Sequence, residues 1–230
     1  MLIRLLPLLV GIAPVVAVFI AYWLGVQHEI LPACNPWLDG CTSISSTGRH
    51  PPGSYLFRAV QLPCAALLAV TWFFSKGWLW RLNRGAHVTR INVMFISGVV
   101  ASLALIVYTT FLGTTEPFYE FMRRFGIYVY FLGTALAQLL LSLTLASYAR
   151  MESEPSLWRL SRQMLVLVAL PFVLGILNLI LKAALDDANA VENSIEWIAS
   201  LCMQTWFVLL YIAWRRTGFE VAVGFGNPVR

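Results

Sequence analysis

LLPLLVGIAPVVAVFIAYWLGV, residues 5–26, is an apolar run without a single charged side chain. A helix needs about 20 such residues to cross the hydrocarbon core of a bilayer. A barrel strand would instead alternate apolar and polar residues over about 10 positions. Because the backbone within lipid must satisfy its own hydrogen bonds, the run predicts a transmembrane helix.

A cleaved signal peptide is the alternative for this first run. Arg4 precedes it, and residues 31–34, Leu-Pro-Ala-Cys, resemble a lipoprotein cleavage box. The run is long for a signal peptide, however, and Gln-His-Glu at 27–29 separates it from that box. We therefore expect residues 5–26 to stay in the protein as a membrane span.

The composition extends this interpretation to the whole chain. Of 230 residues, 59% are hydrophobic and 12% are charged, whereas soluble domains carry about 25% charged residues. The mean hydropathy is +0.74. The fold class that we predict is all-α: a single polytopic transmembrane domain over residues 1–230, built from six helices, with residues 27–54 as an outer cap. The expected spans are 5–26, 55–75, 91–113, 121–148, 163–185 and 194–214.

The positions of the charges predict the orientation. Cytoplasmic loops of membrane proteins are enriched in Lys and Arg. Five of the 16 basic residues fall on the side that we assign to the outside, namely Arg49, Arg58, Arg123, Arg124 and Lys182, and the other eleven fall on the opposite side. Both termini are therefore expected in the cytoplasm. Because the positive charge lies at membrane edges, the net charge of +5 does not indicate a nucleic-acid partner.

A group of residues after the second span admits two interpretations. Trp78 and Trp80 stand beside the cations Lys76, Arg81 and Arg84. The segment could lie along the inner leaflet, where cations meet anionic lipids. A loop that merely carries the positive-inside signal is the simpler interpretation.

Cysteines in the cap predict a disulfide. Cys34 and Cys41 enclose Asn-Pro-Trp-Leu-Asp-Gly, which is rich in turn-forming residues. The outer side of a cell membrane is oxidising, so a bond between them is permitted; two free thiols are the alternative. No His or Cys completes a tetrahedral set at zinc-site spacing, so we expect no metal and no cofactor.

Polar residues near the outer ends of the spans are the candidate functional groups. Charges within a membrane are costly and often functional, and Arg binds phosphate through its planar fork. We expect an outward-facing pocket that binds a lipid headgroup through Arg49, His50, Arg58, Arg123, Arg124 and Glu196. The alternative is structural: these cations extend to the interface, and Arg124 pairs with Glu120, as Lys182 does with Asp186.

Small and polar residues also share one face of each of two spans. Pro171, Gly175, Asn178 and Lys182 follow helical spacing in the fifth span. Such a face marks either a helix contact or a lined cavity. In the fourth span, Gly133 and Ala137 suggest close helix packing, with Gln138 beside them.

With these motifs in hand, the chain resembles the FRAG/DRAM/SFK family of six-span membrane proteins. The resemblance rests on Ile-Ser, Gly, Pro-Pro and an aromatic before the second span, and on Glu-Trp at the start of the sixth. The matching residues are Ile44, Ser45, Gly48, Pro51, Pro52, Phe57, Glu196 and Trp197. Gly53 replaces the family's acidic residue after Pro-Pro, and Arg123 lies near the place of a family histidine. The family includes autophagy modulators and factors that remodel the lipid of GPI-anchored proteins.

The resemblance and the polar residues lead to three functional hypotheses. The first is binding or organising membrane lipid without catalysis. The second is a lipid-remodelling enzyme, for which His50 and Glu196 are the candidate acid or base residues. The sequence contains no serine nucleophile elbow, Walker A motif, His-Glu-x-x-His motif or dinucleotide fingerprint. The third is a small transporter or channel. We expect membrane lipids as partners in a cell (inner or plasma) membrane; a homo-oligomer or another membrane partner is left open.

Overall fold

The computed structural model describes residues 2–184 and 189–221, and the regular structure in these ranges is helical. A short 3₁₀ segment, η1 (Leu2–Leu5), leads into α1 (Leu6–Gln27). The cap contains one turn of helix, α2 (Ile44–Thr47). The remaining long helices are α3 (Gly53–Leu82), α4 (Val88–Phe111), α5 (Pro117–Met151), α6 (Pro155–Ala184) and α7 (Asn189–Arg216).

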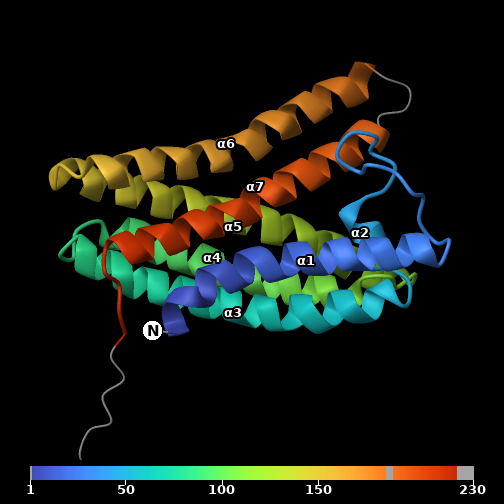
Figure 1. Ribbon diagram of the computed structural model, residues 1–230, viewed down its shortest axis with the longest axis horizontal. Helices are drawn as coiled ribbons and strands as arrows, with labels where there is room; N and C mark the ends of the chain where they lie inside the picture. The colour runs from blue at the N-terminus through green and yellow to red at the C-terminus, as the bar shows by residue number, and fades with distance from the viewer. Residues whose placement is uncertain (1, 185–188, 222–230) are drawn as a thin grey trace, which may run out of the picture.

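The six long helices form a closed ring that follows the order of the chain. α1 contacts α3, α3 contacts α4, and so on to α7, which contacts α1 again. Consecutive long helices run antiparallel, so η1 and the end of α7 lie at the same end of the bundle (Figure 1). We call this the terminal end, and the opposite end, which carries the cap, the loop end.

The prediction of six membrane spans is confirmed: within the described residues, six helices are long and apolar enough to cross a bilayer. α1 matches its predicted span within a residue at each end. α3 and α5 are longer than predicted, at 30 and 35 residues. A 35-residue helix is about 52 Å long, so α5 extends past a hydrocarbon core of about 30 Å. The predicted end of the fifth span at residue 185 lies outside the described residues.

Close helix contacts depend on small residues in α5. A Cβ added to Gly126 would stand 2.8 Å from the backbone nitrogen of Tyr108 in α4. One added to Gly133 would stand 3.0 Å from the Cβ of Ala101. The absence of a side chain at both positions lets the α4 and α5 backbones approach, as expected for small residues between membrane helices.

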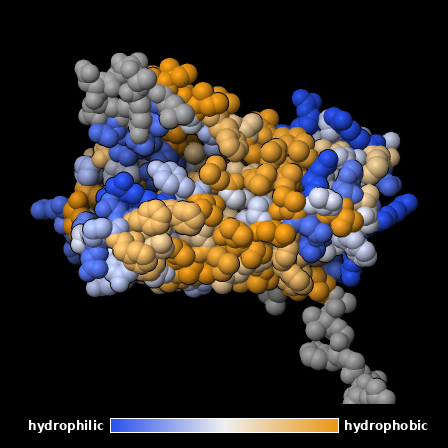
Figure 2. Space-filling view, turned by 180° about the vertical axis from the view of Figure 1, so that it is seen from behind, coloured by the Kyte–Doolittle hydropathy of each residue, from blue (hydrophilic) through white to orange (hydrophobic). Residues whose placement is uncertain are grey.

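α6 is the least packed span. In the most apolar 18-residue stretch of α6, only 22% is buried inside the protein, whereas 39–50% of the corresponding stretch is buried in the other five spans. Near the terminal end it lies beside α5, and it diverges from α5 toward the loop end (Figure 1). The surface of the bundle carries a broad apolar belt with hydrophilic residues gathered at both ends (Figure 2), which is the pattern expected of a protein embedded in lipid.

Candidate functional site

A groove of about 620 Å³ opens between α5, α6 and α7 where α6 diverges. We call it the lateral groove. Its α6 wall is formed in part by Pro171, Gly175 and Asn178, so the polar and small face of this span lines a cavity. A Cβ added to Gly175 would meet no atom within 4 Å. The side chain of Lys182, at the end of the predicted face, lies outside the described residues, as does its proposed partner Asp186.

The mouth of the lateral groove at the loop end is charged. Arg123 and Arg124 come from the second turn of α5, Arg49 from the cap, and Glu192 and Glu196 from α7. The arginines outnumber the glutamates in this lining. A rim of this composition suits the headgroup of an anionic amphiphile, because one guanidinium group can donate two parallel hydrogen bonds to the oxygens of a phosphate.

Arg123 and Arg124 differ in environment although they are adjacent. Both contact the carboxylate of Glu120, Arg124 at 2.6 Å and Arg123 at 3.4 Å. The predicted ion pair between Glu120 and Arg124 is therefore present, and the contact of Glu120 with Arg123 is longer. The Arg123 side chain is 14% exposed and its Nε has no hydrogen-bond partner among the described residues, whereas the Arg124 side chain is 68% exposed. A buried, partly unpartnered guanidinium favours binding an additional anion.

Below this rim the lateral groove becomes apolar. Its walls are lined by Ile127, Phe131 and Leu132 from α5, and by Val168 and Phe172 from α6. Gln138 lies at the deep end, where its amide donates to the backbone oxygen of Met203 in α7 at 2.9 Å. A charged mouth above an apolar shaft matches the two ends of a membrane lipid.

Glu196 lies at the junction of the groove with a second, enclosed space. Its carboxylate is near the backbone of Ser45 and the guanidinium of Arg49, and Arg49 in turn donates to the Ser45 hydroxyl at 3.0 Å. Glu196 also lines the second space, together with Tyr108, Ile127 and Phe131 of the groove wall. The cap thus contributes directly to the environment of this carboxylate.

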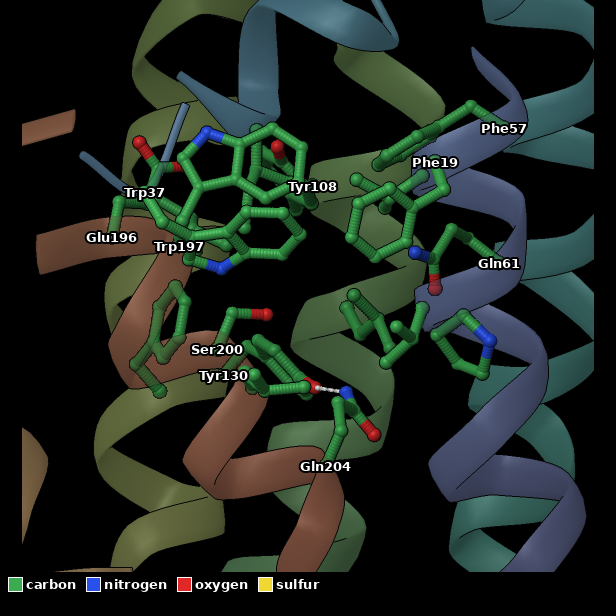
Figure 3. A pocket seen from close by; sticks show the side chains of 18 residues that line it. Phe19, Trp37, Phe57, Gln61, Tyr108, Tyr130, Glu196, Trp197, Ser200 and Gln204 are labelled. Carbon is green, nitrogen blue, oxygen red and sulfur yellow. Dashed lines mark hydrogen bonds between the residues drawn. The ribbon is translucent and has the colours of Figure 1, made fainter. Parts of the chain in front are cut away.

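The second space, which we call the polar chamber, lies inside the ring under the cap (Figure 3). It has a volume of about 60 Å³, and a water molecule needs about 10–15 Å³ by this measure. Tyr130 accepts a 3.3 Å hydrogen bond from Gln204. Gln204 Oε1 and Trp37 Nε1 are buried without partners among the described residues, so the chamber suits several water molecules.

The cap is fixed to the helices at several points. Cys34 and Cys41 form a disulfide, as predicted. Tyr22 of α1 accepts a hydrogen bond from the Cys34 amide at 3.0 Å. Asn193 and Trp197 of α7 donate to the carbonyls of Gly40 and Thr42, each at 2.8 Å, and the Trp37 ring packs against Trp197. These contacts place the cap over the chamber.

Gly40 is required where the cap meets α7. Its φ of +57° belongs to the left-handed region, and an added Cβ would collide with the backbone oxygen of Ala190. Both features favour glycine. The close approach brings Asn193 within reach of the Gly40 carbonyl.

The structure brings four of the six predicted headgroup residues to one place: Arg49, Arg123, Arg124 and Glu196 line the lateral groove. His50 is exposed and lines neither the groove nor the chamber. Arg58 donates to the backbone oxygen of Leu112 and joins α3 to the end of α4. The geometry therefore gives Arg58 a structural contact outside the groove.

Sequence reasoning missed Tyr108, Tyr130 and Gln204 of the polar chamber. The two tyrosines are indistinguishable in sequence from interfacial aromatic residues, and Gln204 stands alone in an apolar span. For Gln204 a signal was present, because an amide within a span is unusual. Within the described residues no three His, Cys, Asp or Glu side chains are grouped as metal ligands.

Comparison with known proteins agrees with the motifs of the cap and of α7. A family model described as the Frag1/DRAM/Sfk1/Cwh43P N-terminal domain matches residues 2–216. The match spans all six transmembrane helices. No curated protein and no solved structure matches the chain significantly.

Proposed function

The chain belongs to the Frag1/DRAM/Sfk1/Cwh43P family, and from this premise we propose that it binds a membrane lipid in the lateral groove. The headgroup lies against Arg49, Arg123 and Arg124, and an acyl chain extends between α5 and α6. The observation that carries the proposal is the continuity of a charged rim with an apolar shaft within one groove of about 620 Å³. Ligand pockets are typically about 300–1,000 Å³.

The opening between α5 and α6 supports entry from the bilayer. Phe172 and Leu132 are 47% and 64% exposed although both line the groove, so an acyl chain there remains continuous with surrounding lipid. Arg123 supports an anionic headgroup, since its partly unpartnered guanidinium gains hydrogen bonds from a phosphate. With the basic residues concentrated at the terminal end, the groove opens to the outer leaflet of the cell membrane.

The test of this proposal is to fill the groove without disturbing its walls. Gly175→Phe places a ring where an added Cβ meets no atom within 4 Å. We expect purified Gly175→Phe protein to retain its thermal stability and to lose one tightly co-purifying phospholipid, measured by native mass spectrometry. Leu103→Phe, on α4 at a side chain that is 57% exposed and does not line the groove, is the control. An unchanged number of phospholipids in Gly175→Phe would overturn the proposal.

Lipid remodelling is the second candidate, and one observation favours it. Glu196 lies between the groove and the polar chamber, which is large enough for several water molecules. A carboxylate beside water is a candidate general base. Membranes containing Glu196→Gln protein should then differ in lipid composition from membranes containing the parent protein. Identical compositions, equal also to those of membranes without the protein, would end this candidate.

Transport is disfavoured by the packing below the chamber. Trp72, Trp206 and Phe207 are fully buried and contact one another through their rings. They lie closer to the terminal end than Gln204 does. A polar solute leaving the chamber in that direction would meet large apolar side chains.

A further inference from the structure

A second groove lies at the terminal end of the bundle, where α3 and α4 meet the segment that follows α7. It has a volume of about 680 Å³ and is separate from the lateral groove. Its lining includes Phe73, Lys76, Gly77, Trp80, Arg81 and Phe95. We call it the terminal groove.

Unpaired cations distinguish the terminal groove. Lys76 and Arg81 form no ion pair with any acid in the part of the chain that the structure describes, and Lys76 Nζ lies 4.8 Å from the centre of the Phe95 ring. Glu220 also lines the groove, but its carboxylate is bound by Arg4 at 2.7 Å. The groove therefore presents positive charge that no described acid neutralises, which complements an anionic ligand.

The depth of these cations matches a phospholipid headgroup. α3 has 30 residues, or about 45 Å of helix, and is therefore longer than the hydrocarbon core of about 30 Å. Lys76 lies about 9 Å before the end of α3. Phe73, one turn nearer the membrane centre, is 61% exposed, and Trp80 is 56% exposed. Apolar contact thus lies on the bilayer side of the cations, and an aromatic ring lies at the interface.

We propose that the terminal groove is a second lipid site, which binds an anionic phospholipid of the leaflet on the terminal side. Lys76 and Arg81 hold the phosphate, and Phe73 and Phe95 contact the acyl chains. This inference goes beyond the lateral groove, because the two grooves open at opposite ends of the bundle. The chain would then hold one lipid in each leaflet.

Gly77 allows a clean test. A Cβ added to it meets no atom within 4 Å, so Gly77→Phe fills the groove while the helix keeps its packing. Delipidated protein is titrated with phosphatidylglycerol or phosphatidylcholine and bound lipids are counted by native mass spectrometry. We expect two tight phosphatidylglycerol molecules on the parent protein, one on Gly77→Phe, one on Gly175→Phe and none on the double variant.

Charge variants test the recognition itself. Lys76→Gln combined with Arg81→Gln should weaken phosphatidylglycerol binding at this site about tenfold or more and leave phosphatidylcholine binding unchanged. Arg84→Gln is the matched control, since Arg84 is exposed, lies 3.7 Å from Glu152 and lines no part of the groove. Inorganic phosphate should not displace the lipid, because it cannot contact the aromatic wall.

Three results would overturn this site: unchanged phosphatidylglycerol binding in Gly77→Phe, equal weakening by Arg84→Gln, or displacement by inorganic phosphate. The first is also the result expected if another segment of the chain filled the groove. Failure of the lateral groove is recognised separately, because Gly175→Phe alters that groove and not the terminal groove.

Discussion

The indole nitrogen of Trp197 donates a 2.8 Å hydrogen bond to the backbone oxygen of Thr42. This bond joins α7 to the cap at the residue that follows Glu196, and both Trp197 and Thr42 are buried. The same indole packs against Trp37 of the disulfide loop. The position of the Glu196 carboxylate between groove and chamber therefore depends on how the cap is held.

Trp197→Phe tests this dependence. The edge-on packing of the ring against Trp37 is largely kept, but the Thr42 oxygen loses its donor while still buried, which costs about 1–3 kcal/mol. We expect the free energy of unfolding in detergent to fall by about this amount. Trp23→Phe, at a site 57% exposed, is the control and should change it little. Equal stability of the two variants would contradict the structural role of the bond.

The disulfide between Cys34 and Cys41 should stabilise the cap. The two cysteines are seven positions apart, and closing so short a loop contributes about 2–3 kcal/mol. Replacing both with Ser should lower the thermal midpoint of unfolding, and a reductant should lower that of the parent protein but not of the variant. A reductant effect of equal size on both would mean that the stabilising bond lies elsewhere.

Two neighbouring arginines should differ in their effect on lipid binding. Arg123→Gln removes a nearly buried cation from the rim and should weaken binding of an anionic phospholipid about tenfold or more. Arg124→Gln removes a cation that is 68% exposed, and such charges contribute less than about 1 kcal/mol. Titration of each variant with phosphatidylglycerol measures the difference. Equal or reversed losses would argue against a headgroup at Arg123.

The orientation of the chain is a prediction that thiol labelling can check. His50 is exposed at the loop end and Glu152 is exposed at the terminal end. In a background with Cys64 and Cys202 replaced by Ala, a membrane-impermeant maleimide added to intact cells should label His50→Cys and not Glu152→Cys. Labelling of Glu152→Cys alone would reverse the orientation and the assignment of both grooves to their leaflets.

Hydropathy predicted the spans well and the helix ends poorly, for a physical reason. Apolar runs report only the part of a helix that lies within lipid. α3 continues through Trp80 and Arg81 to Leu82, whereas the sequence predicted either a loop or a segment along the membrane surface there. Interfacial Trp and Arg are compatible with either a helix or a loop, so composition could not distinguish them.

Several residues of the candidate site could be named from the sequence, but their positions relative to one another could not be predicted. Arg49 and Arg123 were found because cations near apolar spans are conspicuous. That Arg58 instead contacts the Leu112 carbonyl follows from the packing of α3 on α4, which no local pattern encodes. The width of the lateral groove depends on the divergence of α6, and this too is a property of the whole ring.

The most direct test of lipid in the lateral groove uses a phosphatidylglycerol analogue with a photoreactive acyl chain, reconstituted with the protein in liposomes. After illumination, mass spectrometry should locate crosslinks on residues 127–135 and 168–178, and Gly175→Phe should remove most of them. Crosslinks on outward-facing residues such as Ile96 and Leu103, which are 59% and 57% exposed, with none in the groove and no effect of Gly175→Phe, would contradict the account.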